Sequence, residues 1–189
     1  MIPLPLWTGT GWSEAVPSAG LTVLPGSFHP LHEGHRTLAR VAEIRLRTTV
    51  DFELSRVNVD KPGLPDDVIQ RRAVQFREQA RLWVTHAPTF AEKARLFPRA
   101  TFVLGFDTAL RLIDPRYAGN SISQRDRMLG EFADQGCRFL VGGRINAEGV
   151  FCVWEQDAVP AEFRDLFIAL QEADFRVDIS STALRAAME

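Results

Sequence analysis

The sequence predicts an α/β protein built on a Rossmann-like, doubly wound sheet whose strands are mostly parallel. Two observations lead to this prediction. Short apolar runs of strand length alternate along the chain with segments in which apolar residues recur at helical spacing, and Gly or Pro closes several of the runs. Alternating strands and helices form a parallel sheet that is covered on both faces. In such sheets ligands bind beyond the carboxyl ends of the strands, so the residues that follow each strand are the candidates for function.

The chain opens with a segment that has no clear period. Residues 1–20 are rich in Pro, Gly, Ser and Trp, which indicates an extended segment. We expect Trp7 and Trp12 of this segment to pack on a single domain formed by residues 21–189. A chain of 189 residues is long enough for one domain with its own hydrophobic core.

The helices and strands of that domain are predicted from the spacing of apolar residues and from the Gly and Pro residues that end the runs. The apolar run 21–24 ends at Pro25 and is typical of a buried strand, whereas the strand at 49–54 alternates polar and apolar residues. Residues 149–154 are expected to pair with a strand at 138–142 as a hairpin. Further strands are predicted at 84–85 and 101–105, and helices at 33–47, 66–82, 90–97, 123–135 and from Asp178 onward.

Composition and charge exclude several classes of function. Lys and Arg number 22 against 24 Asp and Glu, a net charge of -2, so the chain lacks the basic field of a nonspecific nucleic-acid binder. The longest uncharged run, 15–32, is broken by Pro and Gly residues and is not a membrane helix. Cys137 and Cys152 are predicted to be small buried hydrophobic residues of a reducing compartment. We therefore expect a cytoplasmic protein without nucleic-acid or membrane partners.

The turn after the first strand is the most informative part of the sequence, and residues 26–35 read GSFHPLHEGH. His32 and His35 fall at the predicted N-terminus of the next helix, where backbone N–H groups and the helix dipole favour a phosphate. Imidazoles at i and i+3 lie on one side of a helical turn, and Gly34 leaves room for a bulky anion. These residues suit nucleotidyl transfer, in which a phosphate attacks the α-phosphorus of a nucleoside triphosphate and pyrophosphate leaves. The protein then needs only to align the groups and stabilise phosphoryl charge.

Two other interpretations of this turn stay open. A His pair at this spacing is commonly a surface or half-buried pair without a ligand. Two His side chains are also able to ligate zinc, although no Cys or carboxylate recurs at a matching spacing and Glu33 points to another face of the helix. We therefore assign no metal ligands.

Residues 26–35 resemble the His-x-Gly-His signature of the nucleotidyltransferase α/β-phosphodiesterase superfamily, which includes nicotinamide-mononucleotide and phosphopantetheine adenylyltransferases and the cytidylyltransferases. The family pattern is Gly-x-Phe-Asp/Asn-Pro-x-His-x-Gly-His, and this chain departs from it at His29, where Asp or Asn is usual. The resemblance implies the nucleotidyltransferase fold and catalytic roles for His32 and His35. It also implies nucleotide or phosphate contacts for four neighbouring residues, namely Gly26, Ser27, Phe28 and Gly34.

A second stretch, residues 178–185 near the C-terminus, reads DISSTALR. Its hydroxyl residues Ser180, Ser181 and Thr182 stand at a predicted helix start, where one can cap the helix and the others can donate to phosphate oxygens. Taken alone, a plain N-cap is the simpler interpretation. The stretch is similar to the Ile-Ser-Ser-Thr-x-x-Arg motif that binds the triphosphate in the same family, and this resemblance implies a catalytic role for Arg185.

Four positions between the two motifs are candidates for substrate binding. Gly105 and Asp107 form a Gly-x-Asp segment that resembles that of nicotinamide-mononucleotide adenylyltransferases. At the end of its strand, Asp107 of this chain can accept hydrogen bonds from a ribose. Alternatively, it caps the helix that follows. Arg144 follows the strand at 138–142 and faces either a phosphate or solvent. Lys61 suits a substrate phosphate or is simply a loop lysine.

The resemblance implies an enzyme that transfers a nucleoside monophosphate from ATP or CTP to a phosphorylated small molecule. Mg²⁺ would accompany the nucleoside triphosphate, held largely by its phosphates. The Gly-x-Asp segment favours nicotinamide mononucleotide as acceptor, a step of NAD biosynthesis, with cytidylyl transfer to another acceptor as the near alternative. The departure at His29 and the short tail after Arg185 leave a nucleotide-binding module without turnover as the second hypothesis. Arg71 and Arg72 are expected to be exposed helix residues, with phosphate contact as the alternative. The sequence does not fix the oligomeric state, and a homo-oligomer is possible.

Overall fold

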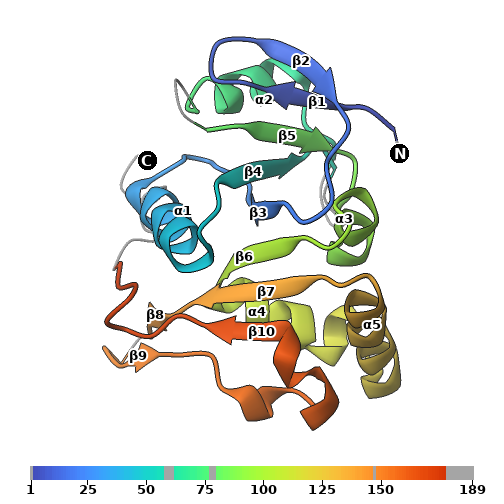
Figure 1. Cartoon of the computed structure of the whole chain (residues 1–189), viewed down its shortest axis with the longest axis vertical. Coiled ribbons are helices and arrows are strands. Elements are labelled where there is room, and N and C mark those ends of the chain that lie inside the picture. The colour runs from blue at the N-terminus through green and yellow to red at the C-terminus, as the bar shows by residue number, and fades with distance from the viewer. Residues whose placement is uncertain (1, 58–61, 77–79, 147, 178–189) are drawn as a thin grey trace.

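The computed structural model of the chain has an α/β fold with a mostly parallel, eight-stranded central sheet flanked by helices (Figure 1). The structure describes residues 2–57, 62–76, 80–146 and 148–177. The predicted fold class is confirmed at this level, because the architecture is compatible with a Rossmann-like fold. In order across the sheet, the strands are β10 (Phe167–Ala169), β7 (Arg138–Gly142), β6 (Thr101–Gly105), β3 (Thr22–Pro25), β4 (Val50–Ser55), β5 (Leu82–Thr85), β1 (Leu4–Trp7) and β2 (Trp12–Ala15).

The strand order reverses at β3. The chain runs outward from β3 through β4 to β5, and then crosses to the other side of β3 and continues through β6, β7 and β10, all in parallel. The ladder between β3 and β6 ends at the pair Val23 and Phe102, although both strands continue beyond it. The carboxyl ends of β3 and β6 therefore form the switch point at which doubly wound sheets bind ligands.

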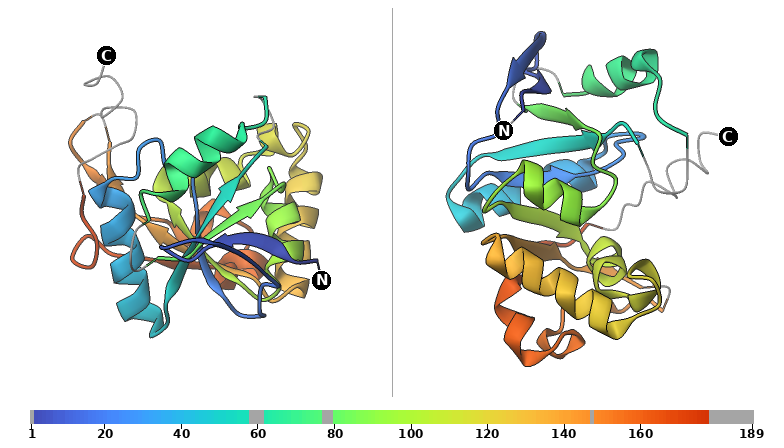
Figure 2. Two further views of the ribbon diagram at one scale, coloured as in Figure 1. Left: turned by 90° about the horizontal axis from the view of Figure 1, so that it is seen from above. Right: turned by 90° about the vertical axis from the view of Figure 1, so that its right-hand side faces the viewer.

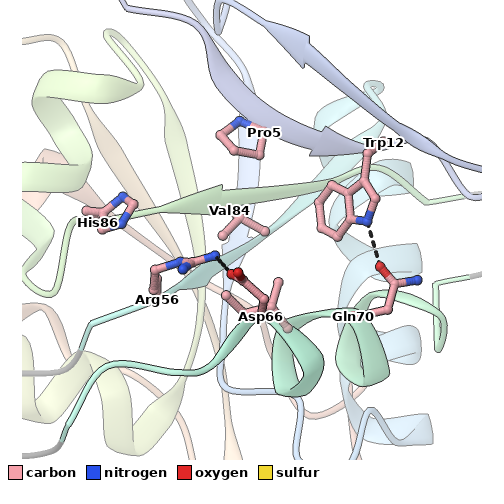
Figure 3. Close-up of a pocket in the computed structure, with 8 residues that line it drawn as sticks. Pro5, Trp12, Arg56, Asp66, Gln70, Val84 and His86 are labelled. Atoms are coloured by element: carbon pink, nitrogen blue, oxygen red, sulfur yellow. Dashed lines mark hydrogen bonds and ion pairs between the residues drawn. The ribbon is translucent and has the colours of Figure 1, made fainter.

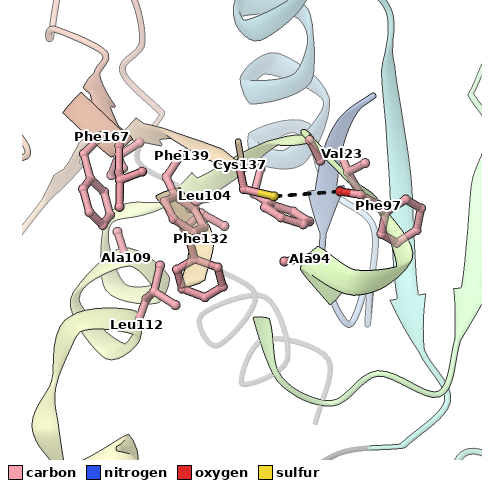
Figure 4. Packing of buried hydrophobic residues seen from close by; sticks show 14 of the residues in the cluster. Val23, Ala94, Phe97, Leu104, Ala109, Leu112, Phe132, Cys137, Phe139 and Phe167 are labelled. Atoms are coloured by element: carbon pink, nitrogen blue, oxygen red, sulfur yellow. Dashed lines mark hydrogen bonds between the residues drawn. The ribbon is translucent and has the colours of Figure 1, made fainter. Parts of the chain in front are cut away.

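Helices cover both faces of the sheet (Figure 2). The helices α1 (Glu33–Leu46) and α2 (Asp66–Ala73) pack on one face, and α3 (Phe90–Leu96), α4 (Phe106–Ile113) and α5 (Ile122–Asp134) pack on the other. Successive strand residues point to opposite faces, so Val23 of β3 belongs to the core under α3, α4 and α5, and Leu24 to the core under α1 and α2. Figure 4 shows the first of these cores, in which Phe132, Phe139 and Cys137 are buried.

The strand β4 is buried on both faces despite its alternating sequence. Asp51 and Glu53 point to the same face as α3 and are 2% and 0% exposed. Asp51 accepts a hydrogen bond from the indole N–H of Trp83 at 2.7 Å, and Glu53 forms an ion pair with Lys93 of α3 at 2.8 Å. Buried charges are tolerated only when they are paired. These contacts therefore fix the positions of β5 and α3 relative to β4.

The N-terminal segment is extended and forms an antiparallel hairpin, β1 and β2, whose first strand pairs with β5 and continues the sheet. Trp7 is buried, whereas Trp12 is 42% exposed and meets Trp7 edge to face, with ring centroids 5.4 Å apart. The segment therefore adds an antiparallel edge to a sheet that is otherwise parallel.

Several predicted elements are wrong in extent or partner. The helix predicted over 66–82 ends at Ala73, and Leu82 already belongs to β5. Residues 149–154 do not pair with β7, because β6 and β10 occupy both of its sides. Instead β9 (Phe151–Cys152) pairs with β8 (Arg144–Ile145). Short 3₁₀ helices at Pro115–Tyr117, Gln156–Ala158 and Ala161–Leu166 complete the described elements.

The remaining expectations have mixed outcomes. Cys137 is buried as predicted, but Cys152 is only half-buried, and both are free thiols. The helix expected from Asp178 onward lies outside the described residues. Within the part of the chain that the structure describes, no helix is both long enough and apolar enough to cross a membrane.

Candidate functional site

The turn between β3 and α1 is built around the buried ring of Phe28. That ring is fully buried and lies edge-on to the rings of Phe52, Phe76 and His35, with centroids 5.5, 5.0 and 5.2 Å away. The backbone of Phe28 has φ 46°, a left-handed conformation that is uncommon for a bulky residue. The packing of the ring holds the backbone in this conformation.

Gly26 precedes this turn and fits directly against the Phe28 ring. A Cβ atom at Gly26 would lie 2.6 Å from Cε1 of Phe28, closer than real Cβ contacts. The side of Gly26 on which a Cβ would lie is thus occupied by Phe28. The Phe28 side chain itself has no exposed surface to offer a nucleotide, whereas Ser27 between the two residues is exposed.

The outer side of the turn is held by residues at the end of α2. Oε1 of Gln75 accepts a hydrogen bond from the backbone N–H of Leu31 at 2.9 Å, and Nε2 of Gln75 donates to the carbonyl of Phe28 at 3.1 Å. Nη1 of Arg72 donates to the carbonyl of Ser27 at 2.8 Å. Sequence reasoning missed both roles, because polar residues at the end of an amphipathic helix carry no signal that distinguishes them from solvent-facing ones.

His32 and His35 stand together at the start of α1. His32 is the N-cap residue and His35 is the third residue of the helix, and their rings stack with centroids 3.7 Å apart and an interplanar angle of 27°. Nδ1 of His35 accepts a hydrogen bond from the backbone N–H of His32 at 3.3 Å. An accepting ring nitrogen carries no proton, so neutral His35 holds its proton on Nε2 and presents an N–H donor there.

Burial keeps both imidazoles neutral at pH 7. Desolvation, reinforced by the repulsion between His35 and His32 when both are protonated, lowers the pKa of His35 to about 4. Desolvation also lowers the pKa of His32 from its usual value. A neutral donor polarises an oxygen without exchanging its own proton, so the pair is suited to binding anionic oxygens rather than to acid catalysis near neutral pH.

The zinc interpretation of the pair finds little support in this geometry. The two rings stack face to face instead of converging on one point, and Nδ1 of His35 is engaged by the backbone. Among the residues that the structure describes, no group of three or more His, Cys, Asp or Glu side chains is placed to hold a metal ion.

A second set of predicted residues lies at the carboxyl ends of the neighbouring strands β6 and β7. Gly105 is the exposed N-cap of α4, and Asp107 lies in the first turn of that helix. Asp107 is therefore not the cap; instead its carboxylate forms an ion pair with Arg144 of β8. Both side chains remain about half exposed, at 53% and 44%, so the pair is accessible to a ligand and contributes little to stability.

A hollow of about 680 Å³ opens beside Asp107. It is formed by α4, the 3₁₀ turn at Pro115–Tyr117 and the start of α5. Three arginines line it, Arg111, Arg116 and Arg125, together with the exposed ring of Tyr117. Its size is within the range of small-molecule sites.

A smaller hollow of about 250 Å³ lies between the N-terminal hairpin and α2 (Figure 3). The indole N–H of Trp12 donates to Gln70 at 2.7 Å across one side, and the ion pair of Arg56 with Asp66 closes another. Among the residues that the structure describes, none of those predicted to bind nucleotide or substrate lines this hollow.

The structure thus brings the predicted residues of the first motif together in one turn: Gly26, Ser27, Phe28, His32, Gly34 and His35. It places Gly105, Asp107 and Arg144 at the ends of adjacent strands. The remaining candidates, Lys61, Ser180, Ser181, Thr182 and Arg185, lie outside the described residues. No protein-family model matches the chain, and no curated protein is similar enough to count as a match.

Proposed function

We propose that the protein is a nucleotidyltransferase of the His-x-Gly-His superfamily, which transfers a nucleoside monophosphate from ATP or CTP to a phosphorylated small molecule. One observation carries the proposal: two stacked, neutral histidines stand at the N-terminus of α1, directly at the switch point of the sheet. Helix amides and imidazole N–H donors at such a place form a site for phosphate.

The reaction requires little covalent chemistry from the protein. An oxygen of the acceptor phosphate attacks the α-phosphorus, the bond from that phosphorus to the bridging oxygen of the β-phosphate breaks, and pyrophosphate leaves with the electron pair. Negative charge is redistributed over phosphoryl oxygens throughout, so donors fixed in advance stabilise the transition state. His35, with its proton fixed on Nε2 and its pKa lowered to about 4, supplies such a donor without a change of protonation.

The second set of residues supplies the rest of a binding site in this proposal. Asp107 would accept hydrogen bonds from ribose hydroxyls, and Arg144, its ion-pair partner, would orient that carboxylate or bind a phosphate. The hollow beside Asp107 offers room for a nucleoside or for the acceptor. Nicotinamide mononucleotide with ATP is our first choice of substrates, and cytidylyl transfer to another phosphorylated acceptor is the alternative.

The donor set of the turn fits the phosphates rather than a cation. Backbone N–H groups, neutral imidazoles and a guanidinium are all hydrogen-bond donors. Mg²⁺ would therefore enter on the triphosphate, where it neutralises charge on the phosphoryl oxygens. The turn holds and orients the remaining oxygens.

The proposal is tested by pyrophosphate release from ATP and from CTP against a panel of phosphorylated acceptors that begins with nicotinamide mononucleotide. We expect release with one nucleotide and a narrow set of acceptors. If ATP or CTP binds while no acceptor gives pyrophosphate, the chain is a nucleotide-binding module and the enzymatic proposal is wrong.

A further inference from the structure

Arg72 carries a positive charge to the phosphate-binding turn from a different part of the chain. It lies in the last turn of α2, and its Nη1 donates to the carbonyl of Ser27 at 2.8 Å. Ser27 precedes Phe28, whose ring contacts His35. The guanidinium of Arg72 is therefore anchored one residue from the aromatic contact that supports the histidine pair.

The charge of Arg72 has no counter-ion within the part of the chain that the structure describes. The ion pairs there involve Lys93 and other arginines, including the preceding residue Arg71, which pairs with Asp67 at 2.6 Å. Nε of Arg72 is buried and has no hydrogen-bond partner among the same residues. Burial of the guanidinium also lowers the pKa of Arg72 from its usual value.

An uncompensated, partly buried guanidinium is costly unless a ligand supplies the negative charge. A guanidinium has five N–H donors in a planar fork, and the carbonyl of Ser27 uses one of its nitrogens. The N–H groups of Nη1 and Nη2 that Ser27 does not use can pair with oxygens of a phosphate. From this geometry we infer that Arg72 binds a phosphoryl oxygen of the ligand held at the β3–α1 turn. The inference rests on the phosphate-binding role proposed above for that turn.

The phosphate has two sources in the proposed reaction, namely the nucleoside triphosphate and the acceptor. Titration calorimetry with inorganic pyrophosphate, with α,β-methylene-ATP and with nicotinamide mononucleotide distinguishes them. We expect Arg72→Ala to weaken binding of at least one of these ligands by about 10- to 100-fold, the size typical of a lost charge-assisted hydrogen bond. The ligand that loses affinity identifies the phosphate that Arg72 contacts.

Two further variants separate a ligand contact from a structural role. Arg72→Gln removes the charge and, because its amide nitrogen ends at the position of Nε, also the bond from Nη1 to Ser27. Its affinity is therefore read beside its melting temperature, and we expect ligand affinity to fall by more than the change in stability explains. Arg72→Lys keeps the charge without the fork and should recover part of the affinity. Arg71→Ala is the matched control, because Arg71 is already paired with Asp67 and should leave binding within twofold of the unmodified protein.

The inference is overturned if Arg72→Gln binds all three ligands as tightly as the unmodified protein, or if the unmodified protein binds none of them. Its failure is distinct from failure of the enzymatic proposal. Arg72-dependent binding without pyrophosphate release would retain Arg72 as a phosphate-binding residue and remove the catalytic claim. If pyrophosphate is released and the Arg72 variants change neither its rate nor the ligand affinity, the catalytic proposal stands and the inference about Arg72 is wrong.

Discussion

Nδ1 of His35 accepts a hydrogen bond from the backbone N–H of His32, 3.3 Å away. This contact closes the first turn of α1, because it satisfies one of the N–H groups that a helix start leaves without a partner. It also decides which nitrogen of His35 carries the proton. Capping of the helix and orientation of the Nε2 donor are therefore properties of one side chain.

The two properties can be separated by His35→Asn. The Asn amide oxygen lies near the position of Nδ1 and can accept from His32, but it provides no donor at the position of Nε2. We expect turnover to fall at least about 100-fold, the size measured for loss of one transition-state donor, with little change in melting temperature. His86→Asn, at an exposed histidine after β5, is the control. An unchanged rate in His35→Asn would refute the assigned role.

Stability should decrease in acid because of His35. Its folded-state pKa of about 4 lies below the unfolded value near 6.5. Between these values the unfolded chain binds a proton that folded His35 does not. The free energy of unfolding therefore falls as the pH drops through this window, by about 2 kcal/mol at pH 4.5. Urea unfolding at pH 7.5 and 4.5 checks this, and an equally steep pH dependence in His35→Asn would contradict it.

Gln75 should act as a clamp on the turn. Gln75→Ala removes the bonds to Leu31 and Phe28 and leaves two part-buried backbone groups without that partner. The expected loss is about 1–3 kcal/mol of unfolding free energy, accompanied by weaker binding of pyrophosphate. Chemical denaturation and calorimetry measure the two effects. Gln70→Ala, which removes only the exposed contact with Trp12, should cost less than about 1 kcal/mol, and equal losses in the two variants would argue against a clamp.

Replacement by alanine should lower the stability of the protein at Gly26 and raise it at Gly130. The Cβ of Gly26→Ala would collide with the buried ring of Phe28, and overpacking of this kind costs about 1–3 kcal/mol. Gly130 lies inside α5 with nothing within 4 Å of the added atom, so alanine there should stabilise the helix by about 0.5–1 kcal/mol. Thermal unfolding of both variants is decisive, and a neutral Gly26→Ala would mean that Phe28 is less tightly packed than the structure has it.

The fold class could be predicted from sequence because the strands and most helices have their own local signals. The predicted strands Thr101–Gly105 and Arg138–Gly142 are both confirmed, because each is a short apolar run with clear ends. The end of α2 has no such signal, because no Gly or Pro separates the helix from β5. That helix stops where Gln75 and Phe76 make contacts with the β3–α1 turn, and tertiary contacts of this kind leave no local pattern.

In the candidate site, too, only features with a local sequence pattern could be predicted. The sequence identifies His32 and His35, because their spacing and the adjacent helix start are local features. For Arg72 it offers phosphate contact only as the alternative to solvent exposure, because Arg72 reaches Ser27 from a segment 45 positions further along the chain. Nor does it show that the ring of Phe28 packs against Gly26. A left-handed Phe two residues after a glycine has no signature in the order of residue types.

In our proposal the β3–α1 turn binds the phosphates of a nucleoside triphosphate. A crystal structure with the α,β-methylene analogue of ATP or CTP would show whether it does. We expect a phosphate oxygen about 2.7–3.2 Å from Nε2 of His35, with the base directed toward the side of the sheet that carries Asp107. A nucleotide bound in the hollow beside Trp12, with no phosphate at the histidine pair, would contradict it.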